Sequence, residues 1–327
     1  KIRSIFLMKN KNGVMSVNAI IEKITEQIQE GIYPGASLAL YRDGQWSEHY
    51  LGLADPEKGE PVVADLVYDL ASVSKVVGVA TICAFLYAKG ELALDRPFKE
   101  LYPRFAHEKT TIRELLTHTS GLDPFIPNRD QLDARQLKTA LENLQLKEDK
   151  SFHYTDVNFL LLGFWLEDRF RQPLDRLFEE LIFTPWKMTE TRFGPVEKAV
   201  PTVRGVASGS VHDPKARVLG RHAGSAGLFS TVADLERFLE RYLKEDFARD
   251  LSQNFAREEG KTRALGWNLE GDWLDHTGYT GTFIMYNRKR QEAVIFLSNR
   301  TYEKDERAQW ILDRNSLMDL IKQEFEK

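Results

Sequence analysis

Apolar residues recur at strand spacing in two stretches, one near each end of the chain. In the first, apolar runs on both sides of Asp43-Gly44 predict a β-hairpin, because this dipeptide favours the tight turn that joins two antiparallel strands. In the second, the runs 282–286 and 293–297 predict another hairpin, and two shorter strands are expected before it at 267–269 and 273–276. Strands from both ends can therefore share one antiparallel sheet.

Helical spacing occupies most of the remaining chain. Ile20, Ile24 and Ile28 recur every four residues and predict a first helix, which Ser16 can cap. A second helix begins at Ser72 and is apolar on nearly every side, which indicates that it is buried. Further helical segments are expected at 112–116, 129–150, 157–170, 173–182 and 231–242, and from about 305 onwards.

This order of elements predicts an α+β fold, in which terminal helices flank an antiparallel sheet and an all-helical region is inserted between the strands. We expect a single domain at 17–327. Its α/β region takes about 17–70 plus 220–327, and its helical region takes about 71–219. Residues 1–16 are expected to be an N-terminal extension that is disordered or foreign to the domain.

The composition is that of an ordinary soluble globular protein, with 42% hydrophobic and 29% charged residues in a chain of 327. A net charge of −4 gives no reason to expect a nucleic acid as partner. The single cysteine, Cys83, excludes an internal disulfide, and the seven histidines show no metal-ligand spacing, so no metal or other cofactor is expected.

No unbroken apolar run reaches about 18 residues, so no transmembrane segment is expected. Because no export signal is clear, the sequence favours a cytoplasmic location, and a truncated N-terminus would favour an extracytoplasmic one. The expected partner is a small-molecule or peptide substrate, and the sequence leaves the oligomeric state open.

Candidate chemistry begins with Ser72-Val73-Ser74-Lys75, which reads S-x-x-K. Ser72 and Lys75 are three residues apart on a helix, so their side chains share a face. A serine hydroxyl needs a nearby proton acceptor to act as a nucleophile, and burial would favour the neutral, accepting form of Lys75. The first turn of this helix also offers backbone N–H groups to a developing oxyanion.

Two further motifs follow in order, and the set of three is far more specific than a lone S-x-x-K. Tyr154, in Tyr154-Thr155-Asp156, is a second candidate to take the serine proton and pass it to the leaving group. His276-Thr277-Gly278 ends a predicted strand. The N–H of Tyr279, directly after it, can be the second oxyanion donor beside the N–H of Ser72.

With these motifs the chain resembles the class C serine β-lactamases, the low-molecular-weight penicillin-binding proteins and the esterases built on the same fold. The resemblance runs from about residue 17 onwards and extends to 115–122, 226–231 and 278–282. It implies a β-lactamase/transpeptidase-like fold and an acyl-enzyme on Ser72, with Lys75 and Tyr154 handling the protons. It also implies an oxyanion hole formed by the backbone around Ser72 and Tyr279.

Two positions depart from the family pattern. The second motif usually reads Tyr-x-Asn, whereas Asp156 places an anion near Lys75, which should keep that lysine protonated and shift the role of base to Tyr154. The third motif usually begins with a lysine that binds the carboxylate of penicillins, and a neutral His276 gives up most of that attraction. Asp156, His276, Thr277 and Gly278 are expected to line the substrate site.

We therefore expect a serine hydrolase that acts on esters or on D-amino-acid peptides and amides, with weak β-lactam hydrolysis. The alternative is a penicillin-binding or sensory module that is acylated without turnover, which the anion at Asp156 keeps open. Structural interpretations also exist for single residues: Ser72 as a helix N-cap, Tyr154 as a core aromatic, and Asp156 as the cap of the helix that follows it.

Overall fold

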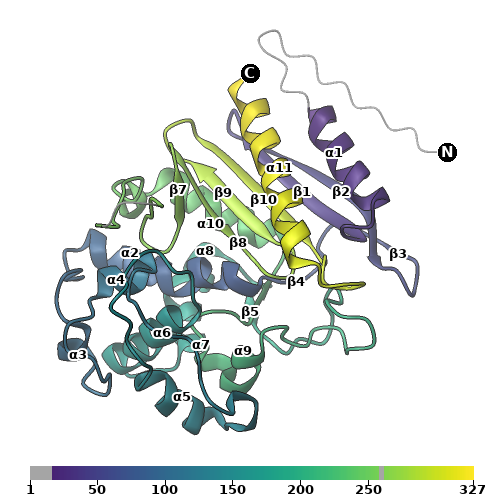
Figure 1. Cartoon of the computed structure of the whole chain (residues 1–327). Helices are drawn as coiled ribbons and strands as arrows, with labels where there is room; N and C mark the ends of the chain where they lie inside the picture. Colours follow the sequence, from purple (N-terminus) through teal and green to yellow (C-terminus); the bar gives the residue numbers. More distant parts are fainter. Residues whose placement is uncertain (1–16, 258–260) are drawn as a thin grey trace.

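The computed structural model describes residues 17–257 and 261–327, and its centre is a seven-stranded antiparallel sheet in the order β3-β2-β1-β10-β9-β8-β7 (Figure 1). β1 (Gly35–Arg42) and β10 (Glu292–Ser298) pair in the middle, with Ala36 opposite Ser298. Both ends of the chain thus share one sheet, as the strand pattern predicts. The other strands are β2 (Gln45–Asp55), β3 (Glu60–Pro61), β7 (Asn268–Glu270), β8 (Trp273–Thr277) and β9 (Phe283–Asn287).

The two terminal helices, α1 (Val17–Gln29) and α11 (Arg307–Glu326), lie side by side on one face of the sheet (Figure 1). Their apolar faces pack against alternate residues of the strands, and Ile24 and Trp310 are buried there. The isoleucine spacing of the sequence is therefore the buried face of α1. The predicted cap at Ser16 and the predicted extension 1–16 lie outside the described residues.

The opposite face of the sheet is covered by α10 (Val232–Lys244), and the helical block lies beyond it (Figure 1). The segment predicted as a helix at 129–150 is α-helical only over α5 (Ala134–Glu142), with a 3₁₀ turn before it. The chain after α5 leaves the helix because its backbone pairs with the segment that begins at Gly121. The remaining helices are α3 (Phe98–Leu101), α4 (Ile112–Thr117), α6 (Val157–Phe170), α7 (Leu174–Phe178), α8 (Thr184–Trp186) and α9 (Pro214–Leu219), with a π-helical turn at Glu179–Phe183 and 3₁₀ turns at Arg129–Gln131, Gly220–His222 and Asp246–Ala248.

One helical segment, 71–88, passes between the sheet and the helical block. It starts as a 3₁₀ turn (Ala71–Val73), continues as a π-helical turn (Val76–Ala80) and ends as α2 (Thr81–Ala88). By length and composition this segment is apolar enough to cross a membrane, although no transmembrane segment is expected from the sequence because the apolar run is interrupted. However, 78% of it is buried inside the protein, as expected for the central helix of a packed core.

A small second sheet joins β4 (Tyr68–Asp69), β6 (Leu228–Ser230) and β5 (Arg192–Phe193) in that order. The sequence pattern does not predict it, because strands of two or three residues are too short to show an alternation of apolar and polar positions. This sheet matters for the site because β4 leads directly into the turn that carries Ser72.

Candidate active site

Ser72 follows a strained backbone turn. The residue before it, Ala71, has a φ of 46°, a left-handed conformation that costs a non-glycine residue about 1–2 kcal/mol. The buried carboxylate of Asp69 holds this turn, because its two oxygens accept the N–H of Ala71 and the N–H of His212, each at 2.8 Å. The turn places Ser72 at the surface of a cleft while its neighbours Ala71 and Val73 are buried.

Lys75 lies one turn after Ser72 and is completely buried. Its Nζ donates three hydrogen bonds: to Ser72 Oγ at 2.8 Å, to Asp156 Oδ1 at 2.7 Å and to the carbonyl oxygen of Ser225 at 3.0 Å. Three donated bonds use all the hydrogens of an ammonium group. Burial opposes the charge, but the Asp156 carboxylate and then the Tyr154 phenol outweigh it, so that the pKa of Lys75 lies above its usual value.

Asp156 is the carboxylate that balances this cation. It occupies the N-cap position of α6, yet its side chain makes no capping hydrogen bond. Instead its second oxygen lies 3.4 Å from Nζ of Lys215. Burial raises the pKa of this carboxyl, but the two lysines, Lys75 first, lower it by more, so its pKa lies below the usual range. The interpretation of Asp156 as a helix cap is therefore replaced by an ion-pair role.

Tyr154 is held above Lys75 by a histidine. The Nζ of Lys75 lies 5.2 Å from the centre of the Tyr154 ring, and the imidazole of His118 packs on that ring with 4.6 Å between centres. His118 accepts hydrogen bonds at Nδ1 from the side chain of Asn158 and the backbone N–H of Thr155. Burial, with the charge of Arg263 next, pushes the pKa of His118 well below its usual value, so the ring is neutral.

The third motif ends β8 and is tied to the Ser72 turn from the other side. Thr280 Oγ1 donates to the carbonyl oxygen of Asp69 at 2.9 Å, and Thr282 Oγ1 donates to that of Leu70 at 3.0 Å. Gly278 is required here, because an added Cβ would lie 2.1 Å from Thr282 Oγ1 and 2.6 Å from the Leu70 oxygen. These contacts bring the backbone of Tyr279 next to Ser72, and both residues line the same cleft.

His276 is buried and neutral. Its Nδ1 donates to the carbonyl oxygen of Thr277 at 3.1 Å, and its Nε2 has no hydrogen-bond partner among the described residues. Burial is the main cause that holds its pKa well below the usual value, and the nearby charges of Lys75 and Arg263 act in the same direction. The expectation of an uncharged side chain at this position agrees with its surroundings.

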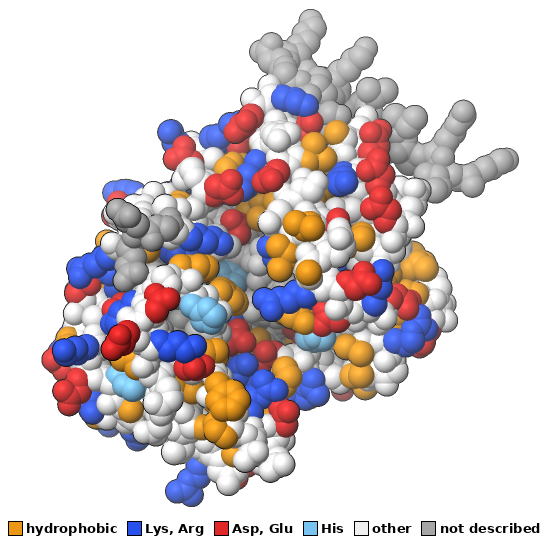
Figure 2. All heavy atoms as spheres, in the orientation of Figure 1, with side chains coloured by type: hydrophobic (Ala, Val, Ile, Leu, Met, Phe, Trp, Pro, Cys, Tyr) orange, Lys and Arg blue, Asp and Glu red, His pale blue; other side chains and the backbone are white. Residues whose placement is uncertain are grey.

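Two cavities meet at Ser72 and Tyr154. One has a volume of about 530 Å³ and extends past Asp156 and Lys215 toward the helical block. The other has a volume of about 210 Å³ and extends along the third motif toward α11. No carboxylate is among the described residues that line the smaller cavity, whereas four cationic side chains are: Lys261, Arg300, Arg307 and Arg314. Figure 2 shows this face hollowed at its middle, with Lys and Arg side chains around the hollow.

Positive charge in the smaller cavity thus comes from outside the third motif. Arg314 belongs to α11 and donates to Thr277 Oγ1 at 3.1 Å. Arg300 is buried and pairs with Asp305, whereas Arg307 stacks above the Tyr279 ring. A neutral His276 in place of the usual lysine predicts the loss of most of the attraction for a carboxylate, but the fold supplies cations at this place from other segments.

The structure brings together the residues that the three motifs predicted: Ser72, Tyr154, His276, Thr277, Gly278 and Tyr279 line one cavity, and Lys75 and Asp156 adjoin them beneath Ser72 and Tyr154. The sequence pattern of the Beta-lactamase family matches residues 20–317. The chain belongs to the β-lactamase family. It is accordingly a serine hydrolase with the β-lactamase/transpeptidase-like fold, and the resemblance drawn from the motifs is confirmed.

The relatives and structural neighbours include proteins named as D-alanine carboxypeptidases and one named as a hydrolase. An Escherichia coli K12 protein named "Putative D-alanyl-D-alanine carboxypeptidase" is 27% identical to this β-lactamase-family chain over 363 aligned positions, which cover 89% of this chain and 83% of that protein. A β-lactamase/D-alanine carboxypeptidase from Pseudomonas syringae superposes with a TM-score of 0.75 at 20% identity, covering 94% of this chain and 98% of the other. The hydrolase EstCE1, described as having promiscuous acyltransferase activity, superposes with a TM-score of 0.75 at 19% identity and the same coverage.

Several residues around the motifs were not found from the sequence. Asp69 and Arg314 carry no signal in a linear pattern, since each acts through contacts with segments about 140 and 40 residues away, His212 and Thr277. His118 lies outside the three motifs, and its ring packs on that of Tyr154. Asn158, two residues after the second motif, bonds to His118 and Ser120.

Proposed function

We propose that this protein hydrolyses esters and D-amino-acid peptides or amides through an acyl-enzyme on Ser72, and that β-lactams are poor substrates. The observation that carries the proposal is the hydrogen-bond pattern of Lys75. Its Nζ donates to Ser72 Oγ at 2.8 Å and donates its other two hydrogens to Asp156 and to the carbonyl oxygen of Ser225. A nucleophile already aligned by an ammonium needs only a second group to remove its proton.

Tyr154 is the group best placed to take that proton. Lys75 has no free lone pair while it donates three hydrogen bonds, so it orients Ser72 and supplies positive charge instead of acting as the base. The Tyr154 ring lies against Lys75 and lines both cavities beside Ser72. In its phenolate form, stabilised by the Lys75 ammonium, Tyr154 removes the serine proton during attack, becomes a phenol and returns the proton to the leaving group. In the second half-reaction the phenolate takes a proton from water and returns it to Ser72.

The backbone supports the charge that develops on the substrate carbonyl. Neither the N–H of Ser72 nor the N–H of Tyr279 has a hydrogen-bond acceptor among the described residues, and the two residues line the same cavities. Two donors that are fixed in place and free of other partners fit the role of an oxyanion hole, which stabilises the tetrahedral intermediate without reorganisation.

The cations of the smaller cavity bear on the substrate class. A peptide that ends in a free carboxylate matches a cavity wall that carries Arg314 and Lys261 and, among the described residues, no acid. The names of the curated relatives agree with a peptidase that removes a C-terminal D-residue, and the neighbour described as a hydrolase with promiscuous acyltransferase activity agrees with a site that accepts more than one type of acyl donor. Both substrate types share the acyl-enzyme step on Ser72.

The test is hydrolysis of p-nitrophenyl butyrate and of an N-acyl-D-Ala-D-Ala peptide by the protein and by Ser72→Ala. We expect the variant to lose at least about 1,000-fold in kcat. Ser74→Ala is the matched control, because Ser74 is a serine of the same turn whose hydroxyl bonds to the backbone N–H of Leu228 and faces away from the cleft. Undiminished ester hydrolysis by Ser72→Ala would refute the assignment.

Intact-mass spectrometry after exposure to a penicillin separates the enzyme from the module that is acylated without turnover. A mass increase on the native protein that is absent from Ser72→Ala and disappears within minutes supports hydrolysis. An adduct that persists for hours, together with no hydrolysis of any ester or peptide, supports the sensory alternative.

A further inference from the structure

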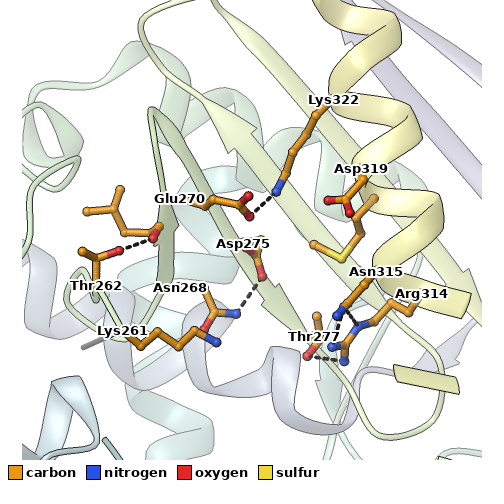
Figure 3. Close-up of a pocket in the computed structure, with 12 residues that line it drawn as sticks. Lys261, Thr262, Asn268, Glu270, Asp275, Thr277, Arg314, Asn315, Asp319 and Lys322 are labelled. Atoms are coloured by element: carbon orange, nitrogen blue, oxygen red, sulfur yellow. Dashed lines mark hydrogen bonds and ion pairs between the residues drawn. The ribbon is translucent and has the colours of Figure 1, made fainter. Parts of the chain in front are cut away.

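A third cavity adjoins the smaller Ser72 cavity on the side of α11. This outer pocket has a volume of about 500 Å³ and lies between β7, β8 and α11 (Figure 3). Four residues line both it and the smaller Ser72 cavity: Lys261, Asn268, Thr277 and Arg314. A substrate that occupies the Ser72 cavity can therefore extend past Thr277 into the outer pocket.

The shared wall between the two cavities is cationic. Arg314 points from α11 to the end of β8 and donates to Thr277 Oγ1 at 3.1 Å (Figure 3). Lys261 approaches the same place from the other side. Neither side chain has an ion-pair partner within the described part of the chain. Arg314 also donates to Asn315 Oδ1 through Nε and Nη2, and the charge of Asp275 acts on both cations. A carboxylate of the substrate would bind the same two cations.

The interior of the outer pocket contains two carboxylates, those of Asp275 and Asp319, that form no ion pair with the described residues. Asp275, on β8, accepts a hydrogen bond from Asn268 Nδ2 at 2.7 Å through one oxygen, and its other oxygen receives none from the described residues. Asp319 projects from α11 toward β8 and makes no ion pair with the described residues (Figure 3). Glu270 and Lys322, the remaining charged pair, bond to each other at 2.6 Å and cancel.

We propose that the outer pocket is a specificity subsite for a leaving D-amino acid with a cationic side chain. The α-carboxylate of this residue would bind Arg314 and Thr277, and its terminal ammonium would lie between Asp275 and Asp319. The inference rests on the proposed hydrolysis of D-amino-acid peptides. A diamino acid has an anion next to the scissile bond and a cation several bonds beyond it, which is the charge order of the shared wall and the pocket interior. An alanine side chain would leave the outer pocket empty.

The test compares kcat/KM for four peptides, N-acyl-D-Ala followed by D-Lys, D-norleucine, D-Glu or D-Ala, at low ionic strength. We expect kcat/KM for the D-Lys peptide to exceed that for the uncharged D-norleucine peptide by about 5-fold, the size of effect that partly exposed ion pairs produce. Asp319→Asn should reduce this preference to below about 2-fold, and Asp319→Lys should favour D-Glu over D-Lys. Asp319 is exposed, so both variants should fold.

The matched control is Asp313→Asn, which removes a carboxylate from another face of α11, where it bonds to Gln309 and does not line the outer pocket. Its D-Lys preference should equal that of the unchanged protein. The methyl ester of the same N-acyl-D-Ala reports the acyl-enzyme step without an amino-acid leaving group. Ester hydrolysis with equal kcat/KM for D-Lys and D-norleucine overturns the subsite and leaves the hydrolase standing. If the ester is hydrolysed but none of the four peptides is, the subsite proposal is also overturned. If the ester is not hydrolysed either, the proposed function fails together with the subsite.

Discussion

At the scale of single residues, one buried carboxylate joins the parts of the site that the motifs leave separate. Asp69 accepts N–H groups from Ala71 and His212, and its own carbonyl accepts the hydroxyl of Thr280. It thereby holds the turn before Ser72, the loop whose His212 ring stacks on Tyr279, and the segment that follows the third motif. We interpret Asp69 as a positioning residue, since it contacts the backbone around the nucleophile and not the cleft.

Asp69→Asn should lower kcat by roughly 10- to 100-fold with little change in KM, because an amide offers one acceptor to two N–H donors and opposes one of them with its own NH₂. Burial raises the pKa of Asp69 to about 6, with Asp213 acting in the same direction and Arg217 against it. The activity of the unchanged protein should therefore fall as pH drops through about 6, when the carboxyl gains a proton and loses an acceptor. The variant should lack this limb of the kcat profile.

The pH dependence of stability at Asp69 should have the opposite sign to the pH dependence of activity: protonation of this carboxyl lowers kcat but favours the folded state. The folded protein binds the proton of Asp69 more tightly than the unfolded chain, whose carboxyl titrates near 4, so this residue contributes less to the free energy of unfolding as pH rises from about 4 to about 6. If kcat of Asp69→Asn still falls as pH drops through about 6, Asp69 is not the group that causes this fall in the unchanged protein.

At the scale of elements, the close contact of the third motif with the Ser72 turn sets the position of the Tyr279 N–H. Gly278→Ala should lower kcat by roughly 100-fold, about the loss of one oxyanion donor, because the added methyl would push this backbone away from Leu70. Gly271→Ala is the control: Gly271 has a positive φ and lies in the β7–β8 turn with open space around it, so the variant should lose thermal stability but not kcat. Equal losses of kcat in both variants would show that the contact at Gly278 has no special effect.

The elements also show what the sequence can and cannot predict. Apolar runs of five or more residues next to turn residues predict β1, β2, β9 and β10 of the main sheet, and β1, β9 and β10 are buried on both faces. Spacing of four predicts α1, because one face of this helix is buried. The strands β3, β4, β5 and β6 have only two or three residues, too few to show such a pattern. The order of Ser72, Lys75 and Tyr154 is visible in the sequence because local spacing and residue type suffice to recognise it.

Other parts of the site depend on packing between distant elements. The positive charge near Thr277 comes from α11, whose sequence reads as an ordinary charged surface helix around Arg314. The third hydrogen bond that Lys75 donates goes to the carbonyl oxygen of Ser225, which lies 150 positions away. Linear spacing contains no information on such contacts.

At the scale of the whole molecule, a contact between acidic side chains of β2 and α10 should lower the free energy of unfolding at alkaline pH. Burial, then the charges of Glu48 and Glu240, raise the pKa of Glu236 to about 8, and its Oε1 has no hydrogen-bond partner among the described residues. A carboxyl with a raised pKa contributes stability that is lost as pH rises from about 4.5 to about 8. The melting temperature of Glu236→Gln should therefore exceed that of the unchanged protein by at least about 2 °C at pH 9 and by less at pH 6.

Calorimetry at both pH values checks this prediction, with Glu22→Gln on the exposed face of α1 as the control that should change neither value. The same melting-temperature difference at pH 6 and pH 9 would contradict it, because a change in packing alone does not depend on a proton.

The central pairing of β1 with β10 has a consequence for how the protein is made. The strand that begins at Gly35 has its β10 neighbour only after Ser298 has been synthesised, and the cleft gains Arg314 from a helix that comes later still. A growing chain on the ribosome can thus contain Ser72, Lys75 and Tyr154 and yet have an incomplete sheet and an open cleft. Nascent chains released at about residue 290 should have no hydrolytic activity, because the enzyme needs β10 and the Arg314 segment of α11 before its sheet and cleft are complete.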